Sequence, residues 1–202
     1  MENLLENNQV ALVGEVVTEF QYSHEVFGEK FYTFELAIER TSAYVDYIPV
    51  MISERLVDVN TDLKGYFVYI GGSYRSFNLH EDDRNRLVLT VFATEIEIDV
   101  DYELTNNIFL NGYVCKEPIY RKTPLGRGIA DVLLAVNRSY GKSDYIPCVL
   151  WGRNAMFAAN FPVGQEVKVN GRIQSRQYQK KISETEFETR VAYEVSVSKI
   201  EL

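Results

Sequence analysis

The sequence is poor in cysteine, with two in 202 residues. When the two halves of the chain are compared, Cys115 falls opposite Val17 and Cys148 falls opposite Val50. Positions shared with valine suit a small apolar core residue. We therefore expect both thiols to be free, with no disulfide between them.

Histidine is equally scarce, and its scarcity excludes several chemistries. His24 and His80 lie in different loop-like stretches, and neither has a second His or Cys at metal-ligand spacing. The second half contains no histidine, which rules out Ser–His and Cys–His catalysis there. Gly141-Lys142-Ser143 resembles the end of a phosphate loop, but Val136 stands where that loop needs glycine. We expect no catalysis, no metal and no cofactor.

Long hydrophobic runs are absent too. No stretch approaches the roughly 20 apolar residues of a membrane helix. The first residues, 1–6, are acidic and lack the basic start and apolar run of a signal peptide. We expect a cytoplasmic, nucleoid-associated protein.

Charge is unevenly distributed along the chain. Residues 1–104 carry 7 Lys+Arg and 20 Asp+Glu, a net charge of -13, whereas residues 105–202 carry 14 and 9, a net charge of +5. Drift of solvated faces is the plain explanation, but such asymmetry also indicates partners. The second half should attract a polyanion, and the first half should repel one.

The chain contains one pattern twice. A shift of 98 positions carries Asp46–Pro49 onto Asp144–Pro147, both reading DYIP, and carries Leu36–Arg40 onto Leu134–Arg138. Slightly larger shifts align later segments, as loop insertions would require. Two copies of a module of roughly 100 residues therefore fill the chain.

We assign residues 1–104 to an acidic copy with a structural or protein-interaction role, and residues 105–202 to a basic copy that should attract a polyanion. Alternation of apolar and polar side chains dominates both copies and predicts β-strands. The predicted strands are 9–19, 30–40, 46–53, 66–75 and 86–98 in the first copy, and 107–116, 129–138, 144–151, 165–175 and 189–200 in the second.

Each copy also predicts one short helix between its third and fourth strands. The Ala-rich stretch from Gly152 to Asn160 ends before Pro162, and its counterpart runs from Glu54 to Asn60. Five short strands with a helix after the third fit a small closed barrel of the OB type, because closure removes exposed edges. A β-sandwich normally needs seven or more strands. We predict an all-β protein of two tandem OB barrels, closely coupled because at most residues 99–105 link them.

OB barrels bind single strands by stacking bases on aromatic side chains in a basic groove. The second copy places four aromatic residues at or just beyond strand ends, each near a cation. These aromatics are Tyr140, Tyr145, Trp151 and Tyr178, and the cations are Arg138, Lys142, Arg153 and Arg176. Any single tyrosine is explained by packing on a half-buried strand. However, Ser53 faces Trp151 and Ser42 faces Tyr140 in the first copy, so the fold alone does not demand these aromatics.

The two hairpins that usually grip an OB ligand are basic in the second copy as well. They read Tyr120–Arg127, with three cations and no acid, and Gln177–Lys181. The predicted DNA-binding residues are Arg121, Lys122, Arg127, Arg138, Tyr140, Tyr145, Trp151, Arg153, Arg172, Arg176, Tyr178 and Lys180.

The first copy has an aromatic hairpin of opposite charge. It contains Phe20, Tyr22, Phe27, Phe31 and Tyr32 together with Glu19, Glu25 and Glu29. An acidic aromatic hairpin suits a protein contact better than a phosphate backbone. An inert flap is the alternative.

Four segments of the second copy together resemble the bacterial single-stranded-DNA-binding protein family. Asn107–Gly112 resembles its opening strand, Leu134–Tyr140 its second strand, Asp144–Arg153 its third and Gly171–Tyr178 its fourth. The resemblance covers most of residues 105–202 and implies stacking roles for the same four aromatics. The first copy resembles the family only faintly, through the repeat.

Two departures from the family pattern bear on partners. Family members usually continue into a flexible tail with an acidic tip that recruits replication and repair enzymes. This sequence reads to Leu202 on its last strand, so we expect no recruitment through such a tail. Members usually carry one barrel per chain and form tetramers, so two barrels imply a homodimer or a higher homo-oligomer.

Sequence and resemblance together predict a non-catalytic protein that coats single-stranded DNA in replication, repair or recombination, mainly through its second barrel. One alternative is an OB-fold protein-interaction module, such as a primosome-like accessory factor, with weak or no DNA binding. Another is an RNA or oligosaccharide binder on the same fold, since fold does not fix the ligand.

Overall fold

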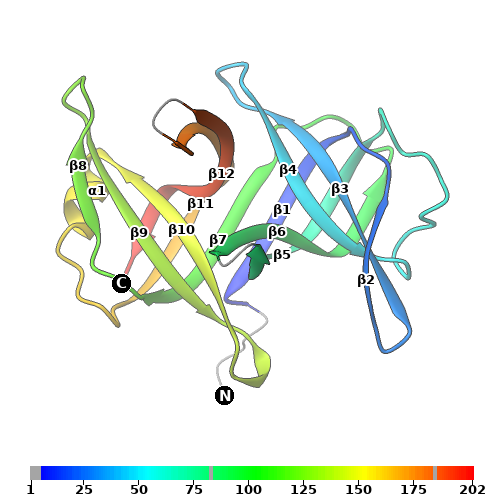
Figure 1. Cartoon of the computed structure of the whole chain (residues 1–202), viewed down its shortest axis with the longest axis horizontal. Helices are drawn as coiled ribbons and strands as arrows, with labels where there is room; N and C mark the ends of the chain where they lie inside the picture. The colour runs from blue at the N-terminus through cyan, green and yellow to red at the C-terminus, as the bar shows by residue number, and fades with distance from the viewer. Residues whose placement is uncertain (1–5, 82–83, 184–185) are drawn as a thin grey trace.

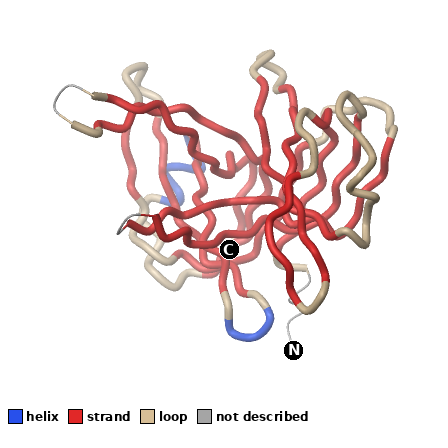
Figure 2. The backbone as a smooth tube through the Cα atoms, turned by 45° about the vertical axis from the view of Figure 1, so that its right-hand side comes forward, coloured by secondary structure: helices blue, strands red, loops and turns tan. Residues whose placement is uncertain are grey.

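The computed structural model describes residues 6–81, 84–183 and 186–202 and contains two β-barrels side by side (Figure 1). Strands dominate both (Figure 2). The first barrel has β1 (Asn8–Val16), β2 (Gln21–Val26), β3 (Glu29–Glu39), β4 (Val45–Ser53), β5 (Phe67–Glu81) and β6 (Arg84–Ile98). The second has β7 (Asn106–Val114), β8 (Ile119–Lys122), β9 (Gly128–Asn137), the 3-10 turn η1 (Ser139–Gly141), β10 (Ser143–Trp151), α1 (Gly152–Ala158), β11 (Glu166–Lys181) and β12 (Phe187–Glu201).

Alternation decides which face of each strand is buried. In β10, Ile146, Cys148 and Leu150 are buried in the barrel core, whereas Tyr145 and Trp151 belong to the outer face. Because side chains of a strand alternate between faces, the same segment lines the core and supplies the outer surface.

Each barrel closes on itself. In the first, β1 pairs with β3 and with β5, β3 with β4, β4 in parallel with β6, and β6 with β5. In the second, β7, β9, β10, β12 and β11 form the equivalent ring. The predicted pair of five-stranded barrels is therefore confirmed. The extra strands β2 and β8 extend β3 and β9 into hairpins at opposite ends of the molecule (Figure 1).

The predicted helix from Glu54 to Asn60 is wrong, because that segment forms turns. The Asp58 carboxylate accepts hydrogen bonds from the backbone and side-chain amides of Asn60, and the Ser53 hydroxyl accepts one from the Arg55 amide. Such local bonds compete with helix formation. The helix predicted in the second copy is confirmed as α1.

The hairpin arms are longer than predicted. Strands β5 and β11 run on to Glu81 and Lys181, beyond the predicted ends at residues 75 and 175. Polar side chains made these extensions resemble loops. The histidines were misplaced for the same reason, since His24 lies in β2 and His80 in β5.

The cysteines behave largely as predicted. Cys148 is buried in the core, Cys115 is half-buried, and both are free thiols. Burial raises the pKa of both thiols, most strongly that of Cys148. Their packing role matches that of the valines in the other copy.

Strands β1 and β7 join the two barrels. They pair antiparallel with Val10 opposite Ile108, Asn8 opposite Leu110 and Leu12 opposite Asn106. In the repeat, Ile108 corresponds to Val10 and Leu110 to Leu12, so the pairing has a pseudo-twofold axis at its centre. The continuous sheet runs from β2 through β1 and β7 to β8.

Two carboxylates reinforce this junction by crossing from one barrel to the other. Asp46 of β4 accepts hydrogen bonds from the backbone amide and hydroxyl of Ser175 at 2.6 and 2.8 Å. Its repeat counterpart Asp144 accepts one from the Ser76 amide at 2.7 Å. Arg40 binds Asp46 through two 2.6 Å hydrogen bonds, whereas the Arg138 guanidinium approaches Asp144 to 3.1 Å without hydrogen-bond alignment.

We expect the two carboxylates to differ in their contribution to stability. Asp46→Asn should lower the free energy of unfolding by about 3–5 kcal/mol, because it breaks a buried ion pair and leaves Arg40 without its partner. Asp144→Asn should cost no more than about 1–2 kcal/mol, because burial already raises the pKa of this carboxyl and disfavours its charge. Urea unfolding of both variants measures the difference, and equal losses would contradict this account of the junction.

A β-bulge in each long arm depends on glycine. A Cβ on Gly171 would lie 2.3 Å from the Ser196 carbonyl oxygen, and one on Gly72 would lie 2.2 Å from that of Phe92. We expect Gly171→Ala and Gly72→Ala each to lower the free energy of unfolding by about 1–3 kcal/mol, the usual cost of overpacking. Gly126→Asn is the control, because this turn glycine has open space and asparagine tolerates its positive φ. A tolerated alanine in either bulge would contradict the close approach.

Candidate nucleic-acid interface

The outer face of β8, β9 and β10 displays a row of predicted site residues. Arg121 of β8 lies opposite Ile129 of β9, which lies opposite Trp151 of β10. Opposed residues on antiparallel strands share a face. The first basic hairpin and the only tryptophan of the chain therefore lie on one surface.

An arginine covers the indole of Trp151. The guanidinium carbon of Arg127, from the turn between β8 and β9, lies 4.9 Å from the ring centroid. A cation at this distance is attracted to the ring face. Arg127 therefore presents a planar cation on this face, and the half-buried indole of Trp151 lies beneath it.

Arg121 is partly neutralised on this face. Its guanidinium donates to both carboxylate oxygens of Asp131, at 3.0 and 3.2 Å, and these bonds raise its pKa. Lys122 is the next residue, so alternation directs it to the opposite face of β8. The structure does not bring Lys122 to the Trp151 row.

The second basic stretch follows every other position of β11. Arg172 and Arg176 are exposed, and Tyr178 is 38% exposed with the Arg176 guanidinium carbon 5.9 Å from its ring centroid. Arg172 lies opposite Ser196 of β12, which pairs with Val149 of β10. This series connects the β11 cations to the face that carries Trp151.

Glutamates on β12 moderate the charge of this arm. The Arg176 guanidinium lies 3.4 Å from Glu194, and Lys180 lies opposite Glu188 in the strand pairing. Arg172 makes no ion pair with any residue in the described ranges. No carboxylate in those ranges therefore neutralises Arg172 on this face.

The remaining predicted residues lie at the two ends of β10. Tyr145 is 44% exposed on the outer face, and Arg153 is exposed in the first turn of α1, next to Trp151. Arg138 and Tyr140 lie at the other end, in the hairpin between β9 and β10. Tyr140 has a φ of 63° and a fully exposed ring, so its hairpin presents it to solvent.

We name the outer face formed by β8, β9, β10, β12 and β11 the outer groove. Of the predicted residues, it carries Arg121, Arg127, Tyr145, Trp151, Arg172, Arg176, Tyr178 and Lys180. Arg153 borders it, while Lys122, Arg138 and Tyr140 lie elsewhere.

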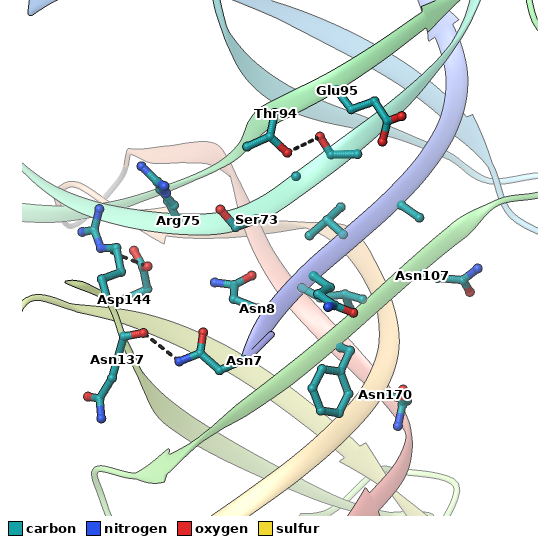
Figure 3. A pocket seen from close by; sticks show the side chains of 18 of the residues that line it. Asn7, Asn8, Ser73, Arg75, Thr94, Glu95, Asn107, Asn137, Asp144 and Asn170 are labelled. Carbon is teal, nitrogen blue, oxygen red and sulfur yellow. Dashed lines mark hydrogen bonds and ion pairs between the residues drawn. The ribbon is translucent and has the colours of Figure 1, made fainter. Parts of the chain in front are cut away.

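A trough of about 940 Å³ runs between the barrels, on the side where Arg138 and Tyr140 lie (Figure 3). Asparagines from both barrels line it, including Asn8, Asn107 and Asn170. No short segment of the sequence indicates this trough, because both barrels are needed to form it. Arg75 of β5 also lines it, and sequence reasoning missed this residue. The available signal was that Arg75 of the acidic copy falls opposite the uncharged Gln174 of the basic copy.

The corresponding face of the first barrel is filled by its own side chains. The His24 and Phe31 rings stack at 5.1 Å, Phe31 lies 5.7 Å from Phe92, and the Arg75 guanidinium covers Phe92 at 3.9 Å. Ser53 stands in the place of Trp151. The two outer faces therefore differ chemically although their backbones correspond.

The aromatic hairpin of the first barrel is only partly free. Phe20 contacts Phe34 edge to face and Tyr22 contacts Tyr32, whereas Phe27 at the tip is fully exposed. Packing within the hairpin thus accounts for most of the aromatics predicted there. Phe27 is the residue most available to a partner.

Within the described ranges, no group of three His, Cys, Asp or Glu side chains is arranged to hold a metal ion. Nor does any helix in those ranges have the length and apolar character needed to cross a membrane.

Comparison with known proteins places the similarity in the second barrel. The profile of the Single-strand binding protein family matches residues 105–202. Single-stranded DNA-binding protein 2 of Listeria innocua is 38% identical over 98 residues, which are 45% of this chain and 62% of that protein. Single-stranded DNA-binding protein B of Bacillus subtilis is 40% identical over 81 residues, which are 37% of this chain and 72% of that protein. The chain thus spans less than two thirds of the length of the Listeria relative.

Structural comparison covers both barrels. The wild-type single-stranded DNA binding protein of Thermus aquaticus superimposes with a TM-score of 0.76 at 20% identity, over 96% of this chain and 91% of that one. At this identity the likeness shows a shared fold. The 40% identity to the Bacillus protein over 72% of its length shows that the chain belongs to the single-strand binding protein family.

Proposed function

We propose that this protein binds single-stranded DNA without catalysing a reaction, and that the outer groove of the second barrel is the main binding surface. The observation that carries the proposal is one continuous face holding Trp151, Tyr145 and Tyr178 among four arginines, Arg121, Arg127, Arg172 and Arg176. The matching relatives named as single-stranded DNA-binding proteins support it.

Base stacking and phosphate contacts would both contribute to the affinity for DNA. Aromatic side chains contribute about 1–3 kcal/mol per stacked base with little dependence on sequence. Tyr145 and Tyr178 expose enough ring surface for this role, and Arg127 over Trp151 adds a second planar surface. Arginines along β11 would neutralise phosphates and release counterions, so salt weakens binding. Such a protein would coat exposed strands in the cytoplasm during replication, repair or recombination.

The first barrel has a supporting role in this proposal. Its net charge of -13 over residues 1–104 repels a phosphate backbone, and its outer face is filled by the stack of His24, Phe31, Phe92 and Arg75. It would stabilise the second barrel through the junction, and its acidic hairpin with the exposed Phe27 would contact a protein.

We also propose self-association. The family resemblance implies four barrels per assembly, which two copies of this chain would supply as a homodimer. Light scattering coupled to size exclusion tests this directly, and a monomer at micromolar concentration would contradict it.

A protein-interaction module is the second candidate function. The acidic first barrel and its exposed Phe27 favour it, because neither feature suits DNA. In that case DNA binding would be weak, and replacing Trp151 would not change the affinity for DNA. Whether the protein prefers DNA or RNA is decided by competition between dT and rU oligomers.

Titration with a dT oligomer tests the main proposal through the emission of Trp151, the single tryptophan of the chain. We expect strong quenching and an affinity that falls several-fold or more when salt is raised. An unchanged emission and no gel shift, at either salt concentration, would contradict DNA binding and favour the protein-interaction module.

Two charge reversals then test the groove, measured by anisotropy of a labelled dT oligomer. Arg172→Glu should weaken binding about tenfold or more and lower the salt slope by about 1, because it removes an unpaired phosphate-binding cation. Lys122→Glu makes the same change in charge on the opposite face of β8, so it should have a distinctly smaller effect. Equal effects would show that net charge, and not the outer groove, governs binding.

A further inference from the structure

Cations from both barrels converge at one end of the trough. Arg75 of β5 and Asp144 of β10 lie at that end, while Glu95 lies at the other (Figure 3). Arg138 and Lys142 of the hairpin between β9 and β10 also line the trough. Three cations thus stand against two carboxylates, and one of those carboxylates is remote.

The repeat shows that this excess of positive charge is specific to one side of the molecule. On the other side, Arg40 makes two 2.6 Å hydrogen bonds to Asp46 and a third to the Ser175 carbonyl. Gln174 stands there in place of Arg75. One arginine therefore meets one carboxylate on that side, whereas Arg75 and Arg138 share Asp144 on the trough side.

The guanidinium groups at the trough have unused donors. The Arg75 Nε is buried without a hydrogen-bond partner, and Arg75 makes no hydrogen bond or ion pair with any residue in the described part of the chain. Its guanidinium carbon lies over the ring of Phe92, 3.9 Å from the ring centroid. Burial and the neighbouring Arg138 lower the pKa of Arg75, and the nearby Asp144 only partly offsets this effect.

Arg75 lines the trough without a hydrogen-bonded carboxylate, and an oxyanion with several acceptors would supply the missing partner there. A guanidinium is planar and offers several N–H donors in a fork whose geometry suits phosphate. Lys142 is exposed on the same hairpin and would add a point charge.

We propose that this end of the trough, formed by Arg75, Arg138 and Lys142, is a second site that binds a phosphate group. Resting on the proposed function, it would hold a backbone phosphate of single-stranded DNA that extends beyond the outer groove, next to the exposed ring of Tyr140. Free phosphate shares this chemistry, and the experiment separates the two sources.

The test compares Arg75→Gln, which installs the residue found at the equivalent position 174, with wild type on labelled dT oligomers of two lengths. An oligomer of about 10 nucleotides fills one OB groove, and one several times longer reaches the trough. Arg75→Gln should lower the salt slope by about 1 on the long oligomer and leave the short one unchanged. Lys64→Gln is the control, because it removes one exposed charge from the same barrel away from the trough.

Each outcome decides the proposal. If Arg75→Gln matches wild type on the long oligomer while Arg172→Glu weakens binding, the trough site is overturned and the outer groove stands. If the wild-type protein binds no oligomer, the proposed function fails, and the arginine Nε–H resonances are followed during addition of inorganic phosphate. A shift that Arg75→Gln abolishes would show a free-phosphate site, and no shift would overturn the proposal. Thermal melting and light scattering of Arg75→Gln confirm that fold and assembly are intact.

Discussion

The pairing of β1 with β7 is the contact on which the rest of the structure depends. It joins the barrels around Val10 and Ile108 and aligns them about a pseudo-twofold axis. Only with that alignment do Asp46 and Asp144 reach serine amides of the opposite barrel. The same pairing places the outer grooves apart and leaves the trough between them.

The two barrels have corresponding backbones, but the side chains on their outer faces differ. One outer groove carries Trp151 beneath Arg127, and the other is filled by a stack that ends in Arg75 on Phe92. The charge of each half follows the same division, because the filled face belongs to the acidic half. A duplicated module thus retained its core while one copy kept an open basic face. This division explains why the family profile matches residues 105–202 while the fold comparison covers both barrels.

The sequence predicted the two barrels well, because the alternation of apolar and polar residues and the internal repeat both reflect which side chains are buried. Alternation also accounts for the shared face of Arg172, Arg176, Tyr178 and Lys180 along β11. It failed where side chains override pattern, as Asp58 does in the turns that replace the predicted helix. It failed again at Arg138 and Arg75, whose positions depend on how two barrels meet, and no short stretch of sequence records that geometry.

The central claim is that single-stranded DNA occupies the outer groove of the second barrel. Photo-crosslinking with a dT oligomer that contains 5-bromouracil, followed by mass spectrometry, locates the contacts without altering the protein. The account predicts crosslinks at Trp151, Tyr145 and Tyr178, and none on the stacked face of the first barrel. Crosslinks concentrated on Phe31 or Phe92 would contradict it.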